Sequence, residues 1–424
     1  MEIQAVQRRS LRVLFVTQVI SGIAVAIGGA VGALLAAEIA GIGVSGVAQS
    51  ALVVGTALFA LPATAIVNRH GRRPSLAAAY FVAMVGAIIV GTAAVRGSIP
   101  LLFLGFFLFG GAAAAGYQAR YAAVDLAPPA LRGRHLSLIV WATTLGAVVG
   151  PSLAALAGAS LDDYGIPTLA GPFFFSALLF ALSTLLLVLL LRPDPAVVAR
   201  SALKTKGAHS PGEHSPGAHP PGMRHALTVV ASQAPARLAV SAMAIGNVVM
   251  IGVMAMTPVH IRSAGHEAAH TLRIVGLVLS FHLAGMFAFS PVFGWLTDRL
   301  GRRPVIVAGF ALLLGACALS GSAGYRQASL AGGMMLLGLG WSATMVAGST
   351  LLSDSVSGEL RASAQGLADL TMGLAGASAG AISGVIVEAW GYPTLTGLAA
   401  LATAPLMVLV SVSKERRREQ GFPG

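Results

Sequence analysis

Twelve apolar runs, each long enough to cross a membrane, constrain this chain more than any other feature of its sequence. About 20 residues of helix cross roughly 30 Å of hydrocarbon, because each residue adds about 1.5 Å. The runs cover approximately residues 11–38, 45–67, 75–95, 99–126, 136–160, 171–191, 236–261, 272–297, 304–323, 328–353, 362–387 and 393–412. With 56% hydrophobic and 10% charged residues, the chain lacks the polar surface of a water-soluble globule. We predict an all-α membrane protein with twelve spans.

A charged motif occurs once in each half of the chain. Segment 68–74 (Asn-Arg-His-Gly-Arg-Arg-Pro) returns 230 residues later as segment 298–304 (Asp-Arg-Leu-Gly-Arg-Arg-Pro). An aspartate follows each copy at nearly the same distance, Asp125 lying 54 residues after Gly71 and Asp354 lying 53 after Gly301. Repetition at this spacing indicates a duplicated domain. We predict two pseudo-symmetric six-helix bundles, residues 1–191 and 236–424, the second with a basic tail, joined by a cytoplasmic His/Pro/Gly-rich linker at 192–235.

The charge distribution predicts the orientation. If both termini are cytoplasmic, most Lys and Arg side chains fall on the inner side, and the loops on the other side hold only Arg96, Arg262, Arg273 and Arg326. This is the positive-inside pattern, and it accounts for most of the +12 net charge without a nucleic-acid partner. The single cysteine, Cys317, lies within a span, which excludes an intramolecular disulfide.

The repeated loops are candidates for a conformational latch. Their arginines lie at the same predicted depth as the two aspartates, and a charge at the membrane edge favours pairing. The predicted latch residues are Arg69, Gly71, Arg72, Asp125, Asp298, Arg299, Gly301, Arg302 and Asp354. Such pairs would hold one conformation and break when the halves rock. The alternative is that these charges only set the orientation.

The second copy resembles the signature loop of the major facilitator superfamily, Gly-x-Leu-x-Asp-Arg-x-Gly-Arg-Arg. It is met in full by Gly294, Leu296, Asp298, Arg299, Gly301, Arg302 and Arg303. The first copy departs from it at Thr64, Ile66 and Asn68, so the first latch is expected to lack one charge. The resemblance implies an alternating-access transporter of twelve helices in the bacterial inner membrane, expected to be monomeric. It names no substrate.

Methionines and histidines at helical spacing occur in the seventh and eighth spans. The pairs Met250 and Met254, Met256 and His260, and His282 and Met286 each stand four residues apart, which places their members on one helix face. We call these six residues the Met/His set. Thioether and imidazole are ligands suited to Cu(I), and neither needs a charge when empty. Pro258 would kink the seventh span beside them.

Three interpretations of the set remain open from spacing alone. Methionine is an ordinary residue of membrane helices, and His282 would suit a proton relay or a packing role as well as a metal. The set also resembles the copper-importing branch of the superfamily, in which paired Met-x3-Met motifs are followed by His-x3-Met in the next helix. That resemblance implies copper uptake, with Met256 and His282 as the essential pair and a cytoplasmic copper acceptor as a partner. In this chain His260 stands where that branch has the last methionine of the second Met-x3-Met pair.

The linker repeats a histidine every five residues, at His209, His214 and His219. Pro and Gly within the repeat favour a flexible segment, whose histidines would hold imported metal transiently or serve only as a spacer. Four further polar residues in spans are candidates for proton coupling or a polar cavity. They are Gln18, Arg120, Asn247 and Asp369, with Gln18 and Asn247 at equivalent positions of the two halves.

The sequence therefore predicts a secondary transporter without a catalytic site or cofactor, because it contains no nucleotide loop, zinc-protease motif or nucleophile elbow. The preferred function is copper uptake. The first alternative is proton-coupled uptake or efflux of a small organic solute, such as a drug or a riboflavin-like compound. A sensor that binds without transporting is the minor alternative.

Overall fold

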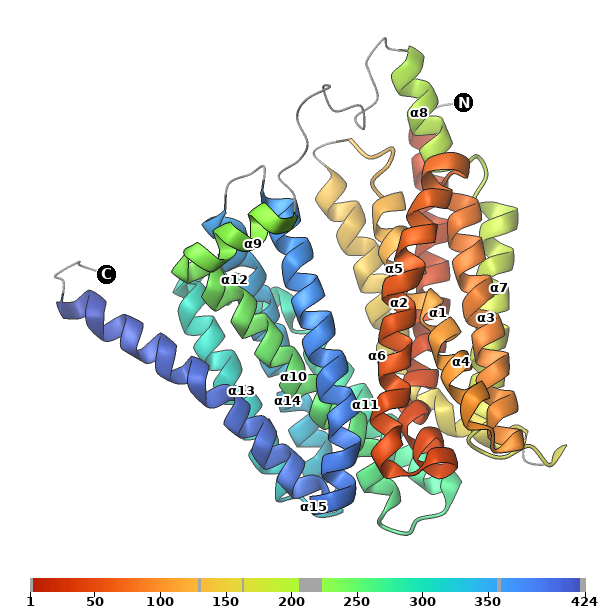
Figure 1. Cartoon of the computed structure of the whole chain (residues 1–424). Helices are drawn as coiled ribbons and strands as arrows, with labels where there is room; N and C mark the ends of the chain where they lie inside the picture. The colour runs from red at the N-terminus through yellow and green to blue at the C-terminus, as the bar shows by residue number, and fades with distance from the viewer. Residues whose placement is uncertain (1–2, 129–130, 162–163, 206–222, 357–359, 420–424) are drawn as a thin grey trace. The chain divides into compact units, whose positions relative to one another are not determined.

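The protein is helical throughout the part that the computed structural model describes, which comprises residues 3–128, 131–161, 164–205, 223–356 and 360–419 (Figure 1). Eleven helical segments within these residues are long and apolar enough to cross a membrane. The last of them, Ala364–Ala404, includes most of the eleventh and twelfth predicted spans, because helix α15 (Arg361–Glu419) continues through a non-helical kink at Gly391. The predicted all-α membrane fold is confirmed.

The chain divides into two compact units, residues 1–217 with 261–280 and residues 218–260 with 281–424. The first unit contains α1 (Ile3–Ala40), α2 (Ile42–His70), α3 (Arg72–Arg96), α4 (Ile99–Phe109), α5 (Gly111–Ala122), α6 (Arg132–Ala159), α7 (Gly171–Leu190) and α8 (Pro195–Thr205). Helix α1 packs against α6, α7 and α2, and α3 packs against α4 and α7. The core of the first unit is rich in aromatic residues, and Phe109 makes edge contacts there with Phe173 and Phe180.

The second unit holds most of the remaining helices. They are α9 (Met223–Ser232), α10 (Ala234–Arg262), α12 (Ser290–Leu300), α13 (Arg302–Gly321), α14 (Gln327–Ser355) and α15. Helix α11 (Ala268–Phe287) is divided, with residues up to 280 in the first unit and the rest in the second. Helix α13 packs against α14 and α15, α12 packs against α14, and α9 packs against α15. Small residues permit these contacts, since a Cβ added at Gly340 of α14 would meet the carbonyl oxygen of Gly309 at 2.8 Å.

Two short helices lie inside the predicted linker, where the sequence reasoning expected none. Asp194 followed by Pro195 begins α8, an arrangement that favours a helix start because the carboxylate caps the first turn and proline fits its first position. In α9, Ala226, Val229 and Val230 share one face, and that face packs in a cluster with α10, α14 and α15. The histidine repeat at His209, His214 and His219 falls outside the described residues.

Candidate functional site

His282 lies at the centre of the candidate site, on α11 in the second unit. Its side chain is 0% exposed, and Nδ1 lies 3.0 Å from the carbonyl oxygen of Met334 on α14. A carbonyl oxygen only accepts, so Nδ1 carries the proton and donates. Nε2 is buried without a hydrogen-bond partner among the described residues. The imidazole is therefore held in one tautomer with a bare lone pair on Nε2.

Two glycines bring α11 and α14 into backbone contact at this point. A Cβ added at Gly338 would collide with the carbonyl oxygen of His282, and one at Gly285 would lie 2.6 Å from the carbonyl oxygen of Met335. Because neither glycine has a side chain, the two helices approach closely enough for His282 to reach Met334.

The first unit repeats this crossing without the histidine. A Cβ at Gly110 would collide with the carbonyl oxygen of Leu52 and approach the amide nitrogen of Thr56, as one at Gly338 would approach His282 and Met286. The 230-residue offset of the sequence motif likewise pairs His282 with Leu52 and Met286 with Thr56. The equivalent helix crossing therefore has Leu52 and Thr56 in the first unit, where the second unit has His282 and Met286.

Most thioethers of the Met/His set are buried in the second unit. Met250, Met256 and Met286 are 6%, 0% and 7% exposed, and Met254 is half-buried. Met334, which the sequence reasoning missed, is also 0% exposed, and its sulfur lies 3.6 Å from the hydroxyl of Thr257. Its residue spacing carried no signal, because no histidine or methionine stands four residues from it on α14.

A metal bound here would depend on sulfur ligands. Among the described residues, no three His, Cys, Asp or Glu side chains are grouped closely enough to hold an ion. His282 offers one nitrogen, Nε2, and the other buried residues of the Met/His set are methionines. Imidazole and thioether ligands are soft or borderline and uncharged.

His260 occupies a different environment from His282. Its ring stacks between Tyr325 and Tyr392, with centroids 5.0 and 4.4 Å away, and its Nε2 lies 2.8 Å from the carbonyl oxygen of Gly324. The half-buried ring is thus held by aromatic and backbone contacts at the end of α10. These contacts fix the orientation of the ring.

The predicted polar pair is buried within the two units, and each member is satisfied there. Gln18, 1% exposed, donates from Nε2 to the Tyr80 hydroxyl at 2.6 Å and accepts from the Thr143 hydroxyl at 3.1 Å. Asn247, 6% exposed, accepts from Trp341 Nε1 at 3.1 Å and donates to the carbonyl oxygen of Met372 at 3.0 Å. Each amide therefore joins helices of its own unit, and a role in proton coupling or a polar cavity stays a prediction.

Arg120 is the less satisfied of the two predicted span charges. Its guanidinium carbon lies 5.3 Å from the ring centroid of Tyr117, and its Nε is buried without a hydrogen-bond partner among the described residues. Tyr117 and Tyr121, on the same part of α5, are exposed. Asp369 is exposed on α15. The structure therefore places an arginine beside aromatic rings on the surface of the first unit.

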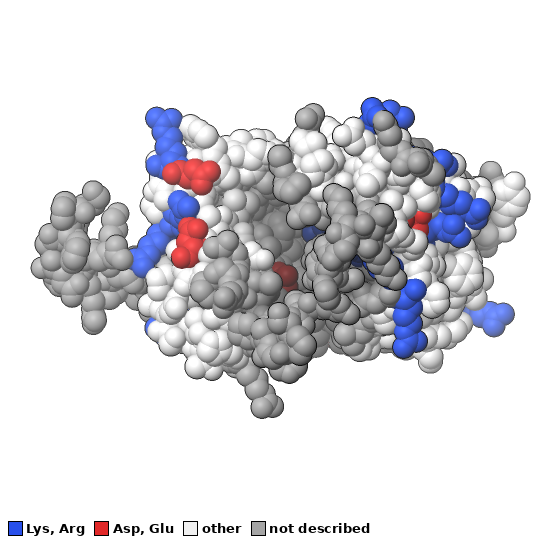
Figure 2. All heavy atoms as spheres, turned by 90° about the horizontal axis from the view of Figure 1, so that it is seen from above, with Lys and Arg blue, Asp and Glu red and all other residues white. Residues whose placement is uncertain are grey.

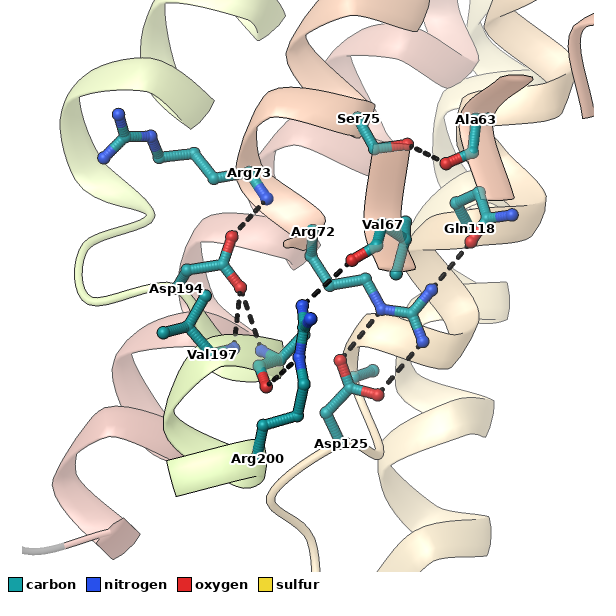
Figure 3. A network of polar contacts seen from close by, with 12 residues as sticks. Ala63, Val67, Arg72, Arg73, Ser75, Gln118, Asp125, Asp194, Val197 and Arg200 are labelled. Carbon is teal, nitrogen blue, oxygen red and sulfur yellow. Dashed lines mark hydrogen bonds and ion pairs between the residues drawn. The ribbon is translucent and has the colours of Figure 1, made fainter. Parts of the chain in front are cut away.

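The first predicted latch forms a compact polar network (Figure 3). Arg72 donates from Nε and Nη2 to the two carboxylate oxygens of Asp125, at 2.9 and 3.1 Å, and from Nη1 to the side-chain oxygen of Gln118 at 2.7 Å. The side chains of Arg72 and Asp125 are only 13% and 16% exposed. A forked pair with this burial fixes the start of α3 against the end of α5.

Asp194 completes this network, although the sequence reasoning did not single it out. One of its oxygens accepts from the backbone nitrogen of Arg73 at 2.7 Å, and the other accepts from those of Ala196 and Val197 at 2.9 and 3.3 Å. One carboxylate thus caps the first turns of both α3 and α8 (Figure 3). Gly71, with φ of 102°, makes room for it, since an added Cβ would lie 2.5 Å from Asp194.

The second latch is looser than the first. Arg302 donates from Nε to Asp354 at 2.9 Å, but the two side chains are 33% and 51% exposed. Arg69, Asp298 and Arg299 are exposed, and the guanidinium of Arg299 lies over the ring of Trp295. The first copy lacks the carboxylate that Asp298 provides in the second, but Asp194 supplies a carboxylate to that loop and the Arg72 pair is better buried than the Arg302 pair.

The end of the molecule that carries α8 is rich in basic side chains. In the view from above, Lys and Arg side chains recur across this face, with Asp or Glu beside some of them (Figure 2). Arg73 and Arg200 belong to this region, and Arg200 donates from Nη2 to the carbonyl oxygen of Val67 at 2.9 Å. That this side faces the cytoplasm stays a prediction from the positive-inside pattern.

Comparison with known proteins identifies close similarity to membrane transporters. A model of the Major Facilitator Superfamily matches residues 14–272 and 264–423. The uncharacterized MFS-type transporters YdeG and YddS of Bacillus subtilis are 35% and 34% identical, covering 96% and 97% of this chain and 92% of each relative. The riboflavin transporter RfnT of Brucella anthropi is 25% identical over 96% of this chain and 94% of its own.

Solved transporters share the fold at low sequence identity. The nucleoside transporter NupG superposes with a TM-score of 0.73 at 14% identity, covering 94% of this chain and 99% of its own. A bacterial homolog of the lysosomal transporter Spinster, in an inward-facing and unoccupied conformation, gives a TM-score of 0.67 at 17% identity, covering 96% and 94%. At these identities the similarity concerns the fold alone.

Proposed function

The chain belongs to the Major Facilitator Superfamily, and from that premise we propose that this multi-pass membrane transporter carries copper into the cell through the Met/His set. The proposal places the protein in the bacterial inner membrane with both termini in the cytoplasm. Copper would be bound as Cu(I) by His282 and thioethers of the second unit, and released inward after the two halves rock.

The bare Nε2 of His282 is the observation that carries this proposal. A buried polar atom without a partner costs about 1–3 kcal/mol, so such an atom needs a reason to persist. Metal-binding histidines commonly donate one ring nitrogen to a carbonyl oxygen, which orients the other toward the metal. His282 has this arrangement with Met334, and methionines of α10, α11 and α14 are buried in the same unit.

The energetics also suit import of a cation. Imidazole and thioether are neutral, so the empty site carries no charge through the membrane. A monovalent cation moving inward gains about 2.3 kcal/mol per 100 mV of membrane potential, which allows uptake without ATP. Neutral ligands bind Cu(I) in preference to hard ions, which need oxygen ligands and higher coordination numbers.

Cu(I) binding to the purified protein tests the proposal. A colorimetric Cu(I) chelator competes with the protein in detergent, and retained Cu(I) is measured for the wild type and for His282→Ala and Met256→Ala. We expect each substitution to weaken binding by at least about 10–100-fold, the range known for loss of groups that merely support a metal ligand. Met243→Ala is the control, since Met243 is buried on α10 outside the set. Equal retention by all variants would refute the copper site.

A small organic solute is the second candidate, and Arg120 favours it. An arginine near the cytoplasmic end of a span, with an unpartnered Nε and exposed tyrosines beside it, suits a planar or anionic solute. Similarity to a riboflavin transporter over nearly the whole chain supports the same class of substrate. In this case the bare Nε2 of His282 would take part in proton coupling.

Transport assays separate the two candidates. Uptake of an organic solute driven by protons should collapse when the proton gradient is removed and should be indifferent to copper chelation. Copper uptake should stop with chelation and persist without the gradient. Arg120→Ala should abolish solute uptake under the second candidate and leave copper uptake intact under the first.

A further inference from the structure

Two histidines outside the Met/His set lie in contact on the loop between α10 and α11. The rings of His266 and His270 are 4.9 Å apart between centroids, with planes inclined by 71°. Both side chains are exposed, so packing does not account for their contact.

The local backbone holds the two rings together. The chain turns at Gly265, where φ is 81°, and α11 begins at Ala268. The amide nitrogen of Thr271 donates to the carbonyl oxygen of Glu267 at 2.9 Å, and its buried hydroxyl donates to that of His266 at 3.3 Å. These bonds tie residues 266 and 267, which precede α11, to the first turn of that helix, and the rings of His266 and His270 meet there.

The pair also lies on the side of the membrane from which an imported ion would come. Helix α10 starts just after the linker and runs 29 residues to Arg262, about 43 Å at 1.5 Å per residue. The loop that follows it is therefore at the opposite membrane face from the linker. If the linker is cytoplasmic, as the basic residues predict, His266 and His270 are outside.

We propose that His266 and His270 form a two-imidazole site that captures a transition-metal cation at the outer surface. This inference rests on the proposed function for the identity of that cation, copper, but not for its binding chemistry. Imidazole nitrogens bind copper, nickel and zinc, at about 2.0–2.1 Å for zinc. Two ligands on one ion need nitrogens about 3–4 Å apart, which two exposed rings with centroids 4.9 Å apart reach by small rotations.

The number of protein ligands determines how tightly this site would bind an ion and how fast it would release it. Among the described residues, no third His, Cys, Asp or Glu completes a metal-binding group, so water fills the remaining positions. A site with two protein ligands binds weakly and exchanges its ion readily. It suits capture from dilute solution followed by release to a site of higher affinity, and it does not suit storage.

Spectroscopy with Cu(II) as the probe tests the site directly. The parent for this experiment is the full chain without an affinity tag, in detergent, with His209, His214, His219 and His225 replaced by alanine to remove linker binding. We expect one bound Cu(II) whose electron paramagnetic resonance spectrum shows coupling to imidazole nitrogens. His266→Gln or His270→Gln should abolish this signal, whereas His70→Gln, at an exposed histidine of α2, should leave it unchanged. A double variant that retains the signal overturns the proposal.

Uptake measurements then show whether the site serves transport. In proteoliposomes containing the same parent, His270→Gln should raise the half-saturating copper concentration several-fold without changing the maximal rate. Unchanged half-saturation would overturn the capture role even if the signal is lost. Because the spectroscopic result does not involve His282 or Met256, failure of the proposed copper transport would leave the metal site itself standing.

Discussion

His282 donates from Nδ1 to the carbonyl oxygen of Met334 across 3.0 Å, while its Nε2 faces the buried interior of the second unit without a partner among the described residues. We predict that His282→Leu leaves the stability of the folded protein unchanged or raises it by up to about 1 kcal/mol. The substitution removes the buried, unpartnered Nε2, which should stabilise the protein by about 1–3 kcal/mol. This gain outweighs the loss of the Nδ1 hydrogen bond, which contributes about 0.5–1.5 kcal/mol. Thermal unfolding in detergent measures the difference.

The same experiment with Cu(I) separates a functional histidine from a packing one. A ligand that binds the native state raises the unfolding temperature. Cu(I) should therefore stabilise the wild type and have no effect on His282→Leu. A variant that is several degrees less stable than the wild type without Cu(I) would indicate that His282 is kept for packing.

The two equivalent glycines provide a matched pair of substitutions. Gly338→Ala and Gly110→Ala both place a Cβ against a backbone carbonyl, so each should destabilise the protein by about 1–3 kcal/mol. Only Gly338→Ala should also weaken Cu(I) binding, because only that crossing carries His282. Gly373→Ala, where an added Cβ meets nothing within 4 Å, should be neutral or stabilising by up to about 1 kcal/mol. Equal Cu(I) affinity in all three variants would contradict this account.

The two latches differ in burial, and their substitutions should differ in cost. Removing the guanidinium with Arg72→Met leaves Asp125 partly buried and unpaired, which should destabilise the protein by about 2–4 kcal/mol. Arg302→Met removes an exposed pair, for which about 0–1 kcal/mol is expected. Unfolding temperatures should fall by about 2–4 °C per kcal/mol for units of this size. A larger loss for Arg302→Met would show that exposure does not govern these pairs.

Asp194 should tie α8 to the start of α3. In Asp194→Ala, the backbone nitrogens of Arg73, Ala196 and Val197 lose their shared acceptor, at a cost of about 0.5–2 kcal/mol for each helix cap. Limited proteolysis should therefore cut within 195–205 faster than in the wild type. Asp194→Asn keeps an acceptor oxygen, so its cleavage rate should lie between those of the wild type and Asp194→Ala. Identical cleavage rates for all three proteins would mean that α8 is held by other contacts.

Much of the fold followed from the sequence because lipid leaves few alternatives for the backbone. Apolar length located the spans, and the twelve predicted runs coincide with the observed helices to within a few residues at most ends. The kinks were not predictable in this way. Helix α11 ends at Phe287 and α12 begins at Ser290 inside one predicted run, with Pro291 in the first turn of α12.

The candidate site was predictable only in part. Helical spacing found His282 and Met286, and the repeat offset paired them with Leu52 and Thr56, which the glycine contacts of both units match. Met334 was missed because it reaches the site from another helix, through a contact that no spacing within one span reveals. Asp194 was missed because it lies outside the repeat and acts through backbone nitrogens, which leave no motif.

Copper counterflow in proteoliposomes tests the central claim most directly. Vesicles loaded with unlabelled Cu(I) under reducing conditions are diluted into trace radioactive copper, and transient accumulation of label is recorded for the wild type, His282→Ala and the buried control Met243→Ala. The account predicts accumulation by the wild type and by Met243→Ala and none by His282→Ala. Accumulation by His282→Ala at the wild-type rate, or none by the wild type, would contradict it.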